Sequence, residues 1–178
     1  MPITVRPATV ADAAPLSRLA ATTFRETFEA HNTPADMARY LAEAFTPARQ
    51  ASEIADPAAV VLLAEAVDVV GGASTLVGYA HLLAGEVPVA VRGPAPVELK
   101  RLYVARDWHG RGVASALMEA TIGAARSRGG RTLWLGVWEH NPRAVAFYAK
   151  HAFVRVGEHA FVLGDDVQTD WLLARPLD

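Results

Sequence analysis

The first third of the chain carries the hydrophobic spacing of amphipathic helices. Thr9 and Asp12, three residues apart, form a capping box, and Asp12 is itself a second candidate for the helix cap. Two later threonines each precede a proline, which places a capping hydroxyl directly before a proline at the first helical position. These patterns predict one strand and three helices: a strand over 3–6, a helix from Thr9 or Asp12 to about Phe28, a helix starting at Thr33, and a helix from Thr46 to about Ala55.

The remaining residues alternate between β-rich apolar runs and two further helical patterns. Prolines and a glycine between residues 88 and 96 exclude regular structure there and predict a loop. The predicted elements are, in order, strand 60–67, turn 68–72, strand 76–87, loop 88–96, strand 97–104, a helix from near Gly112 to about Ala125, strand 131–137, a helix from Asn141 to about His151, and strands 153–163 and 169–173.

The helical connection through residues 112–125 predicts a mixed sheet. Two strands joined by a helix, here 97–104 and 131–137, run parallel in a right-handed crossover, whereas hairpins make neighbouring strands antiparallel. We therefore expect an α/β (α+β) fold with a central, mostly antiparallel sheet, one parallel strand pair, and about four to five flanking helices.

The composition fits a single domain over residues 1–178. The chain has 178 residues, of which 52% are hydrophobic, and this is enough for one well-buried core. The formal net charge is −2 with acids and bases intermixed, so no long-range field favours nucleic acid or an anionic membrane as a partner. The absence of cysteine excludes thiolate metal sites and cysteine nucleophiles, and we expect no bound metal.

The sequence also bears on location and assembly. The N-terminus lacks the basic start and apolar core of a signal peptide, and no apolar stretch approaches the roughly 20 residues of a membrane span. We therefore expect a cytoplasmic protein without a membrane partner. Exposed strand edges near the C-terminal hairpin are compatible with a homodimer.

A glycine turn lies between strand 97–104 and the helix that follows it. Gly110, Arg111 and Gly112 bring unpaired N–H groups and the positive end of a helix dipole together, which favours a phosphate. A dinucleotide-binding fingerprint would need glycine where Ser115 stands, and a Walker loop would need lysine followed by serine or threonine. A tight turn without a ligand is one interpretation; the other is a cradle for the pyrophosphate of coenzyme A.

This stretch resembles the GCN5-related N-acetyltransferase (GNAT) superfamily. The signature of that family has Gln or Arg, then Gly three positions later, then Gly or Ala two positions further on. His109, Gly112 and Ala114 occupy these three positions. His109 departs from the signature, and the resemblance implies that this position contributes mainly its backbone N–H.

A second block, residues 141–153, resembles the later segment of the same family. There the resemblance assigns Asn141 and Tyr148 to the cofactor, and a glycine usually stands where Ala152 does. Read alone, Asn141 is a helix N-cap before a proline and Tyr148 is a core aromatic at helical spacing, and the two sets of roles are compatible. The separation of the two blocks makes the joint match specific.

Further similarity extends over most of the chain. The PaiA-like branch of polyamine-type acetyltransferases is similar at residues 23–28, 32–34, 40–45, 98–104 and 134–139. The resemblance implies a ternary complex in which an acetyl group passes from acetyl-CoA to a primary amine of a small molecule, with a polyamine as one candidate acceptor.

The resemblance also implies how the cofactor is held. Two central strands splay apart, the backbone of one pairs with the pantetheine arm, and a strand N–H near Tyr103 or Val104 stabilises the oxyanion. The pyrophosphate then lies on the N–H groups of the glycine turn, where Arg111 adds charge, although a solvent-facing arginine is an equal alternative. The predicted cofactor-binding residues are Leu102, Tyr103, Val104, His109, Gly110, Arg111, Gly112, Val113, Ala114 and Asn141.

Acetyl transfer to an amine needs a base and an acid. An alkylammonium group with a pKa near ~10 must lose a proton before it attacks, and Glu98 is the first candidate for the base, with Glu139 and His81 as weaker candidates. A solvated strand residue is the alternative interpretation of Glu98. By resemblance, the Tyr148 hydroxyl is the proton donor to the leaving thiolate.

Four acids of the N-terminal helical segment are candidates for receiving a polycationic acceptor, although a solvated helix face is the more common role of such residues. They are Glu26, Glu29, Asp36 and Glu43. Three competing functions remain: a catalytically idle acyl-CoA-binding regulator, a peptide or protein N-acetyltransferase, and a nucleotide-dependent oxidoreductase.

Overall fold

The computed structural model describes residues 1–68, 71–163 and 166–177. Its strands form one seven-stranded sheet in the order β1-β2-β3-β4-β5-β7-β6. Neighbours are antiparallel except β4 and β5, which are parallel. The strands are β1 (Ile3–Pro7), β2 (Ala59–Val67), β3 (Ser74–Leu83), β4 (Pro96–Val104), β5 (Thr132–Trp138), β6 (Val154–Leu163) and β7 (Asp166–Pro176).

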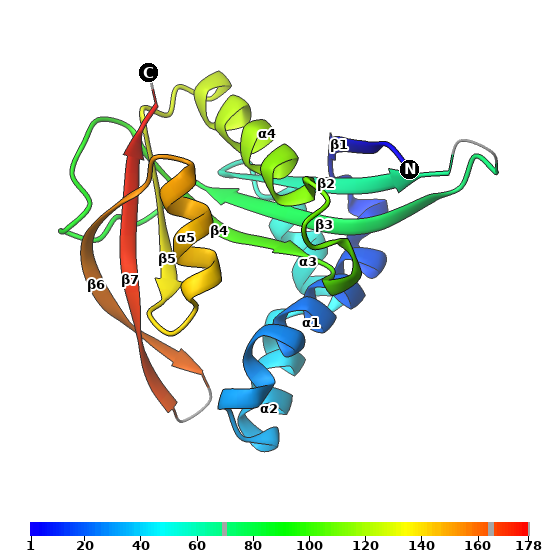
Figure 1. The fold of residues 1–178 in the computed structure, drawn as a ribbon, viewed down its shortest axis with the longest axis horizontal. Coiled ribbons are helices and arrows are strands. Elements are labelled where there is room, and N and C mark those ends of the chain that lie inside the picture. The colour runs from blue at the N-terminus through cyan, green and yellow to red at the C-terminus, as the bar shows by residue number, and fades with distance from the viewer. Residues whose placement is uncertain (69–70, 164–165, 178) are drawn as a thin grey trace.

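Five α-helices cover the two faces of this sheet (Figure 1). They are α1 (Ala13–Phe28), α2 (Pro34–Ala44), α3 (Pro47–Ala55), α4 (Val113–Ser127) and α5 (Pro142–Lys150). Helices α4 and α5 pack on one face, and α1, α2 and α3 lie on the other. In the part of the chain that the structure describes, no helix is long and apolar enough to cross a membrane.

The predicted mixed sheet with one parallel pair is confirmed, and most element boundaries agree within two residues. The third strand is the main difference, since β3 begins at Ser74 and ends at Leu83 instead of spanning 76–87. Gly85 and Pro88 follow and interrupt the pairing, so the apolar residues up to Val87 belong to the loop. The predicted turn 68–72 includes residues 69–70, which lie outside the described part of the chain.

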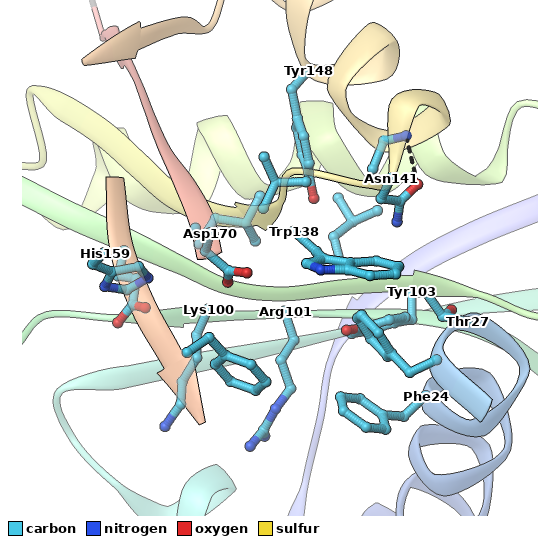
Figure 2. A pocket seen from close by; sticks show the side chains of 18 of the residues that line it. Phe24, Thr27, Lys100, Arg101, Tyr103, Trp138, Asn141, Tyr148, His159 and Asp170 are labelled. Carbon is cyan, nitrogen blue, oxygen red and sulfur yellow. Dashed lines mark hydrogen bonds between the residues drawn. The ribbon is translucent and has the colours of Figure 1, made fainter. Parts of the chain in front are cut away.

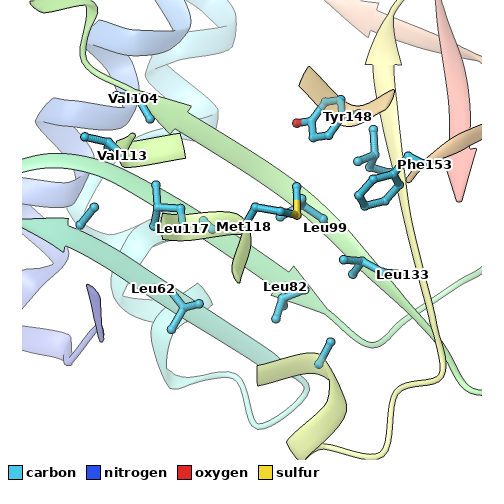
Figure 3. Packing of buried hydrophobic residues seen from close by; sticks show 14 of the residues in the cluster. Leu62, Leu82, Leu99, Val104, Val113, Leu117, Met118, Leu133, Tyr148 and Phe153 are labelled. Atoms are coloured by element: carbon cyan, nitrogen blue, oxygen red, sulfur yellow. The ribbon is translucent and has the colours of Figure 1, made fainter. Parts of the chain in front are cut away.

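Helix α4 forms the centre of the larger apolar core (Figure 3). Its Leu117 and Met118 are completely buried and pack among strand residues such as Leu99 and Leu133. A second core on the opposite face is rich in aromatic rings from α1 and α2, including Phe24 and Phe28. The burial of these two helix faces fixes α4 and α1 on opposite sides of β4.

The parallel pair separates after three register positions. Pro96, Val97 and Glu98 of β4 face Thr132, Leu133 and Trp134 of β5, and the pairing stops there. On its other edge β4 stays paired with β3 as far as Val104. The strand therefore has one paired edge and one open edge beyond Glu98, and the splay expected from the resemblance is present at this point (Figure 1).

Candidate active site

A cavity of about 230 Å³ lies where β4 and β5 diverge (Figure 2). Helices α1, α2 and α5 and strands β4, β5, β6 and β7 all contribute to its wall. Its lining residues are Phe24, Thr27, Phe28, Tyr40, Glu98, Leu99, Lys100, Arg101, Leu102, Tyr103, Gly136, Val137, Trp138, Asn141, Ala144, Tyr148, His159, Phe161 and Asp170. The cavity thus brings together the predicted pair Glu98 and Tyr148 with several residues that the sequence did not single out.

The open edge of β4 presents backbone groups to the splay. The Ala105 N–H donates to the Val77 carbonyl at 2.8 Å, so the amides of residues 105 and 103 point toward β3. Backbone direction alternates along a strand, and the amides of Leu102 and Val104 therefore point toward the gap. This is the edge to which an extended ligand would add as a strand. Tyr103 contributes its ring to the cavity, while its amide points away from the gap, which leaves Val104 as the better placed oxyanion donor of the two.

The glycine turn ends in the start of α4. Gly110 and Gly112 have φ angles of +76° and +81°, a region that residues with a side chain rarely adopt. A Cβ at either position would meet nothing within 4 Å, so the turn borders open space. No side chain caps Gly112, and the first-turn amides of Val113 and Ala114 have no partner within the helix.

Arg111 projects from the same turn, and its guanidinium carbon lies 5.0 Å from the centre of the Trp108 ring. This contact holds the side chain beside the turn and leaves its charge close to the open space.

His109 connects this turn with two other elements. Its Nδ1 accepts a hydrogen bond from Arg143 Nη1 at 2.7 Å, so the proton of the neutral ring is on Nε2, which donates to the Val104 carbonyl at 2.8 Å. Its backbone N–H donates to the Arg106 carbonyl at 3.1 Å. In this structure the side chain of His109, more than its amide, shapes the border of the splay.

Asn141 and Tyr148 both come from α5. The Asn141 side chain caps the helix by accepting the Ala144 N–H at 3.1 Å, as the sequence predicts for a residue before proline (Figure 2). The Tyr148 ring is 9% exposed and packs against Phe153, while its hydroxyl points into the cavity. Burial raises the pKa of this phenol, so the hydroxyl is protonated and available as a donor at neutral pH.

Glu98 occupies the last paired position of β4, at the base of the splay. Burial raises the pKa of its carboxyl, and the positive charges of Lys100 and Arg101 oppose this effect. A carboxylate with a raised pKa is a stronger base than one in water. The position and the pKa are consistent with the predicted proton acceptor.

The weaker base candidates do not line this cavity. His81 is 2% exposed, and its Nδ1 lies 3.7 Å from Glu53 Oε2, which also accepts from Arg101 Nη1 at 2.6 Å. Burial, first of all, lowers the pKa of His81 to about 4, so the ring is neutral and lies buried beside Glu53. Glu139 lies on a separate, more open surface hollow beside His31.

The four acids of the N-terminal helices that were predicted to bind a polycationic acceptor are also absent from the described residues that line the cavity. Tyr40 and Phe24, on the same helices, do line it. The hydrophobic faces of α1 and α2 thus point toward the cavity, and the acids Glu26, Glu29, Asp36 and Glu43 lie elsewhere on these helices.

Sequence reasoning missed several titratable side chains of the cavity wall, among them Lys100, Arg101, His159 and Asp170. Asp170 of β7 faces Trp138 of β5 in the sheet register, and burial raises the pKa of its carboxyl to about 6. The only sequence signal was an acid within the predicted strand 169–173, a pattern that many solvated strand residues share. Its approach to Glu98 and Tyr148 depends on the order of β5, β7 and β6, which no local pattern encodes.

These features fit coenzyme A. The open turn with positive φ angles and unpartnered amides suits a pyrophosphate, and the unpaired edge of β4 suits the two amide groups of a pantetheine arm. The cavity beyond Leu102 provides space for an acyl group and an acceptor. The fold and the site together define an acyltransferase that uses a coenzyme A thioester.

Comparison with known proteins identifies the family. The model of the acetyltransferase (GNAT) family matches residues 20–153, and the chain therefore belongs to the GNAT family. An uncharacterised N-acetyltransferase of Lactobacillus delbrueckii subsp. lactis is 36% identical over 155 residues, which cover 87% of this chain and 86% of that protein. An uncharacterised N-acetyltransferase of Mycobacterium tuberculosis is 33% identical over 166 residues, 93% of this chain and 98% of the relative.

Solved structures show the same fold. The PaiA N-acetyltransferase of Thermoplasma acidophilum, in complex with coenzyme A, has a TM-score of 0.77 at 17% identity, with 99% of both chains covered. A putative acetyltransferase from Salmonella typhimurium with its cofactor acetyl-CoA has a TM-score of 0.66 at 20% identity, covering 100% of this chain and 95% of the other. The chain is an acetyl-CoA-dependent N-acetyltransferase, as the resemblance implied.

Proposed function

We propose that this N-acetyltransferase acts on a primary amine of a small molecule, with Glu98 as the base and Tyr148 as the acid. The observation that carries the proposal is the placement of both side chains in the wall of one cavity at the open edge of β4. That cavity measures about 230 Å³, which suits a small acceptor better than a folded protein surface.

The cofactor contacts follow from the same geometry. The Leu102 amide pairs with the pantetheine arm, and the N–H groups from Gly110 to Ala114 border the pyrophosphate, of which those of Val113 and Ala114 lack a helical partner. The His109 N–H is already bonded to the Arg106 carbonyl. Arg111, held beside Trp108, adds positive charge. Asn141 caps α5 with its side-chain oxygen and keeps its amide nitrogen for the pantetheine arm.

Acetyl-CoA, when bound, supplies the thioester carbonyl carbon that the amine attacks. Glu98 takes one proton from the ammonium group, directly or through water, which frees the nitrogen lone pair for the new C–N bond. The Val104 amide stabilises the developing oxyanion. Tyr148 donates its proton to the thiolate, which becomes the S–H group of coenzyme A. The second proton that the nitrogen loses restores the Tyr148 hydroxyl, and the proton taken by Glu98 goes to solvent.

A polyamine is the finer version of this proposal, and it rests on the resemblance to the PaiA-like branch. The structure offers Glu98 and Asp170 as the carboxyl groups among the described residues that line the cavity. A peptide acceptor is the second version.

A screen that follows release of the free thiol of coenzyme A tests these versions. The panel contains spermidine, spermine, monoamines, amino acids and short peptides, with Glu98→Gln and Tyr148→Phe as variants. We expect turnover of small amines and a fall of at least about 10²-fold in kcat for Glu98→Gln, the lower end of general base catalysis. Activity confined to peptides would overturn the small-molecule version, and acetyl-CoA binding with no thiol release would indicate an idle binding protein.

Two broader expectations complete the proposal. The first is a cytoplasmic location, which we propose for this enzyme. A homodimer would protect β6, the edge strand on which Val154 and Val162 are 62% and 57% exposed. Sedimentation analysis at several concentrations tests the dimer.

A further inference from the structure

The floor of the cavity is a gap between two apolar clusters on one face of the sheet. Trp134 and Leu172 pack with Val91 at one end of this face, and the aromatic core of α1 and α2 covers the other end. Between them lies Gly136 of β5, which faces Leu172 in the register and has no side chain to close the gap. No side chain of Gly136 itself therefore covers the sheet at this point.

Two polar side chains project into the space that Gly136 leaves. A carbon at its Cβ position would lie 3.0 Å from His159 Nε2 and 3.3 Å from Asp170 Oδ2. Figure 2 shows the Asp170 carboxyl group directed into the cavity, beside His159. Within the described residues, Asp170 makes no hydrogen bond or ion pair.

The charges around the cavity are unevenly distributed. Lys100 and Arg101 line the cavity, but both cations are directed toward Glu53 of α3: Arg101 is bound to it at 2.6 Å, and Lys100 lies 4.0 Å from the same carboxyl group. In Figure 2 their side chains point away from Asp170. They affect the pKa of Glu98, whereas burial alone accounts for the raised pKa of Asp170. His159 is neutral, since partial burial lowers its pKa, and it does not compensate the charge of Asp170.

Five aromatic rings line the same cavity as the Asp170 carboxylate. Tyr40 stacks on Phe24 with 4.6 Å between ring centres and meets Phe161 at 6.0 Å, and Trp138 meets Phe28 at 5.8 Å. All five rings line the cavity. Such a wall favours an apolar body, and its ring faces also attract a cation placed near the carboxylate.

We infer that Asp170 binds the ammonium group of the acceptor, and that the acceptor is a monoamine with an aryl or branched alkyl body. This inference rests on the proposed function and specifies its substrate class. Among the described residues that line the cavity, Asp170 supplies a negative charge that no hydrogen bond or ion pair compensates, and the rings take up the body. The further ammonium groups of a polyamine would face the aromatic wall, because the acids of α1 and α2 do not line the cavity.

Steady-state kinetics of wild type and Asp170→Asn tests the inference, with 2-phenylethylamine and spermidine as acceptors. We expect wild type to prefer 2-phenylethylamine in kcat/KM. We expect Asp170→Asn to raise the KM for this amine by about 10- to 100-fold, the value of a charge-assisted hydrogen bond, while kcat and the KM for acetyl-CoA change less than about twofold. Glu98→Gln should show the opposite effect, with kcat lowered and the KM for the amine little changed.

Glu158→Gln is the matched control, because it removes an exposed carboxylate from the neighbouring strand β6, where Glu158 pairs with Arg155 outside the cavity. It should leave both constants unchanged. Preference for spermidine, or an unchanged KM in Asp170→Asn, would overturn the inference, as would a loss confined to kcat.

Calorimetry separates this inference from the proposed function. Titration of 2-phenylethylamine into the coenzyme A complex measures acceptor binding without turnover. If no amine is acetylated, the proposed function fails, while weaker binding to Asp170→Asn than to wild type still supports the acceptor site. If wild type does not bind the amine, the inference fails even where thiol release is observed with other acceptors.

Discussion

Arg143 of α5 donates a hydrogen bond to His109 of the glycine turn, with 2.7 Å between Nη1 and Nδ1. The same imidazole donates to the Val104 carbonyl, so one ring joins the start of α5, the turn before α4 and the open end of β4. These three segments form the border along which the cofactor is proposed to lie. His109, which departs from the family signature, thus links the start of α5, the glycine turn and the open end of β4 through its side chain.

Replacing this ring should weaken cofactor binding. We expect His109→Ala to raise the dissociation constant of acetyl-CoA by about tenfold, since two hydrogen bonds that hold the border are lost and each contributes about 0.5–1.5 kcal/mol. Calorimetric titration measures the change. His140→Ala is the control, because His140 is exposed and lies outside the turn. Equal affinity in wild type and His109→Ala would contradict the role of the link.

Tyr148→Phe separates proton donation from packing. The ring stays in contact with Phe153, and only the hydroxyl that points into the cavity is removed. We expect kcat to fall by about 10²-fold or more, as for loss of a general acid, with the affinity for acetyl-CoA unchanged within about twofold. Stopped-flow measurement of thiol release gives the rate. Unchanged turnover would remove Tyr148 as the acid.

Ala152 stands where the family pattern usually has glycine, and this is a second departure from that pattern. It follows α5 with a φ angle of +63°, a left-handed conformation that strains any residue with a Cβ. We expect Ala152→Gly to stabilise the protein by about 0.5–1 kcal/mol, or about 1–4 °C in Tm, because relief of strain exceeds the entropy cost of glycine. Ala149→Gly, inside α5, should lower Tm instead. Thermal unfolding of both variants gives the comparison.

The Asp170 carboxyl makes stability and acceptor binding respond oppositely to pH. Its pKa is raised from 3.8 to about 6, so the folded state binds more protons between these values and loses stability as pH rises through 6. Asp170→Asn should therefore have a higher Tm than wild type at pH 7.5, and the difference should vanish below pH 4. Thermal unfolding across this range checks the sign.

The pH dependence of the KM for the amine acceptor provides a second test of Asp170. In wild type, the KM for 2-phenylethylamine should rise as pH falls through about 6, because the protonated carboxyl no longer attracts an ammonium group. In Asp170→Asn it should stay flat over the same range. A rise of equal size in both proteins would assign the titration to another group, such as Glu98.

The sequence predicts the local elements and the cofactor side of the site better than the acceptor side. Gly112 before α4 and Asn141 before Pro142 have local signatures, because turns and caps depend on neighbouring residues. Asp170 and Gly136 have none, since their proximity results from the register of β5 and β7. The contact of His109 with Arg143 likewise joins positions 34 residues apart and depends on how α5 packs.

Only three pairs of residues connect β4 to β5, so the two halves of the sheet are joined by a short hydrogen-bonded segment. Beyond Glu98 the hydrogen-bonded ladder of the sheet is interrupted at its centre, with four strands on one side and three on the other. A ligand that forms hydrogen bonds with the backbone in this gap would connect the two halves of the sheet. Amide hydrogen exchange at Leu102 and Val104 should then slow when acetyl-CoA is added, which makes these two positions internal reporters of cofactor occupancy.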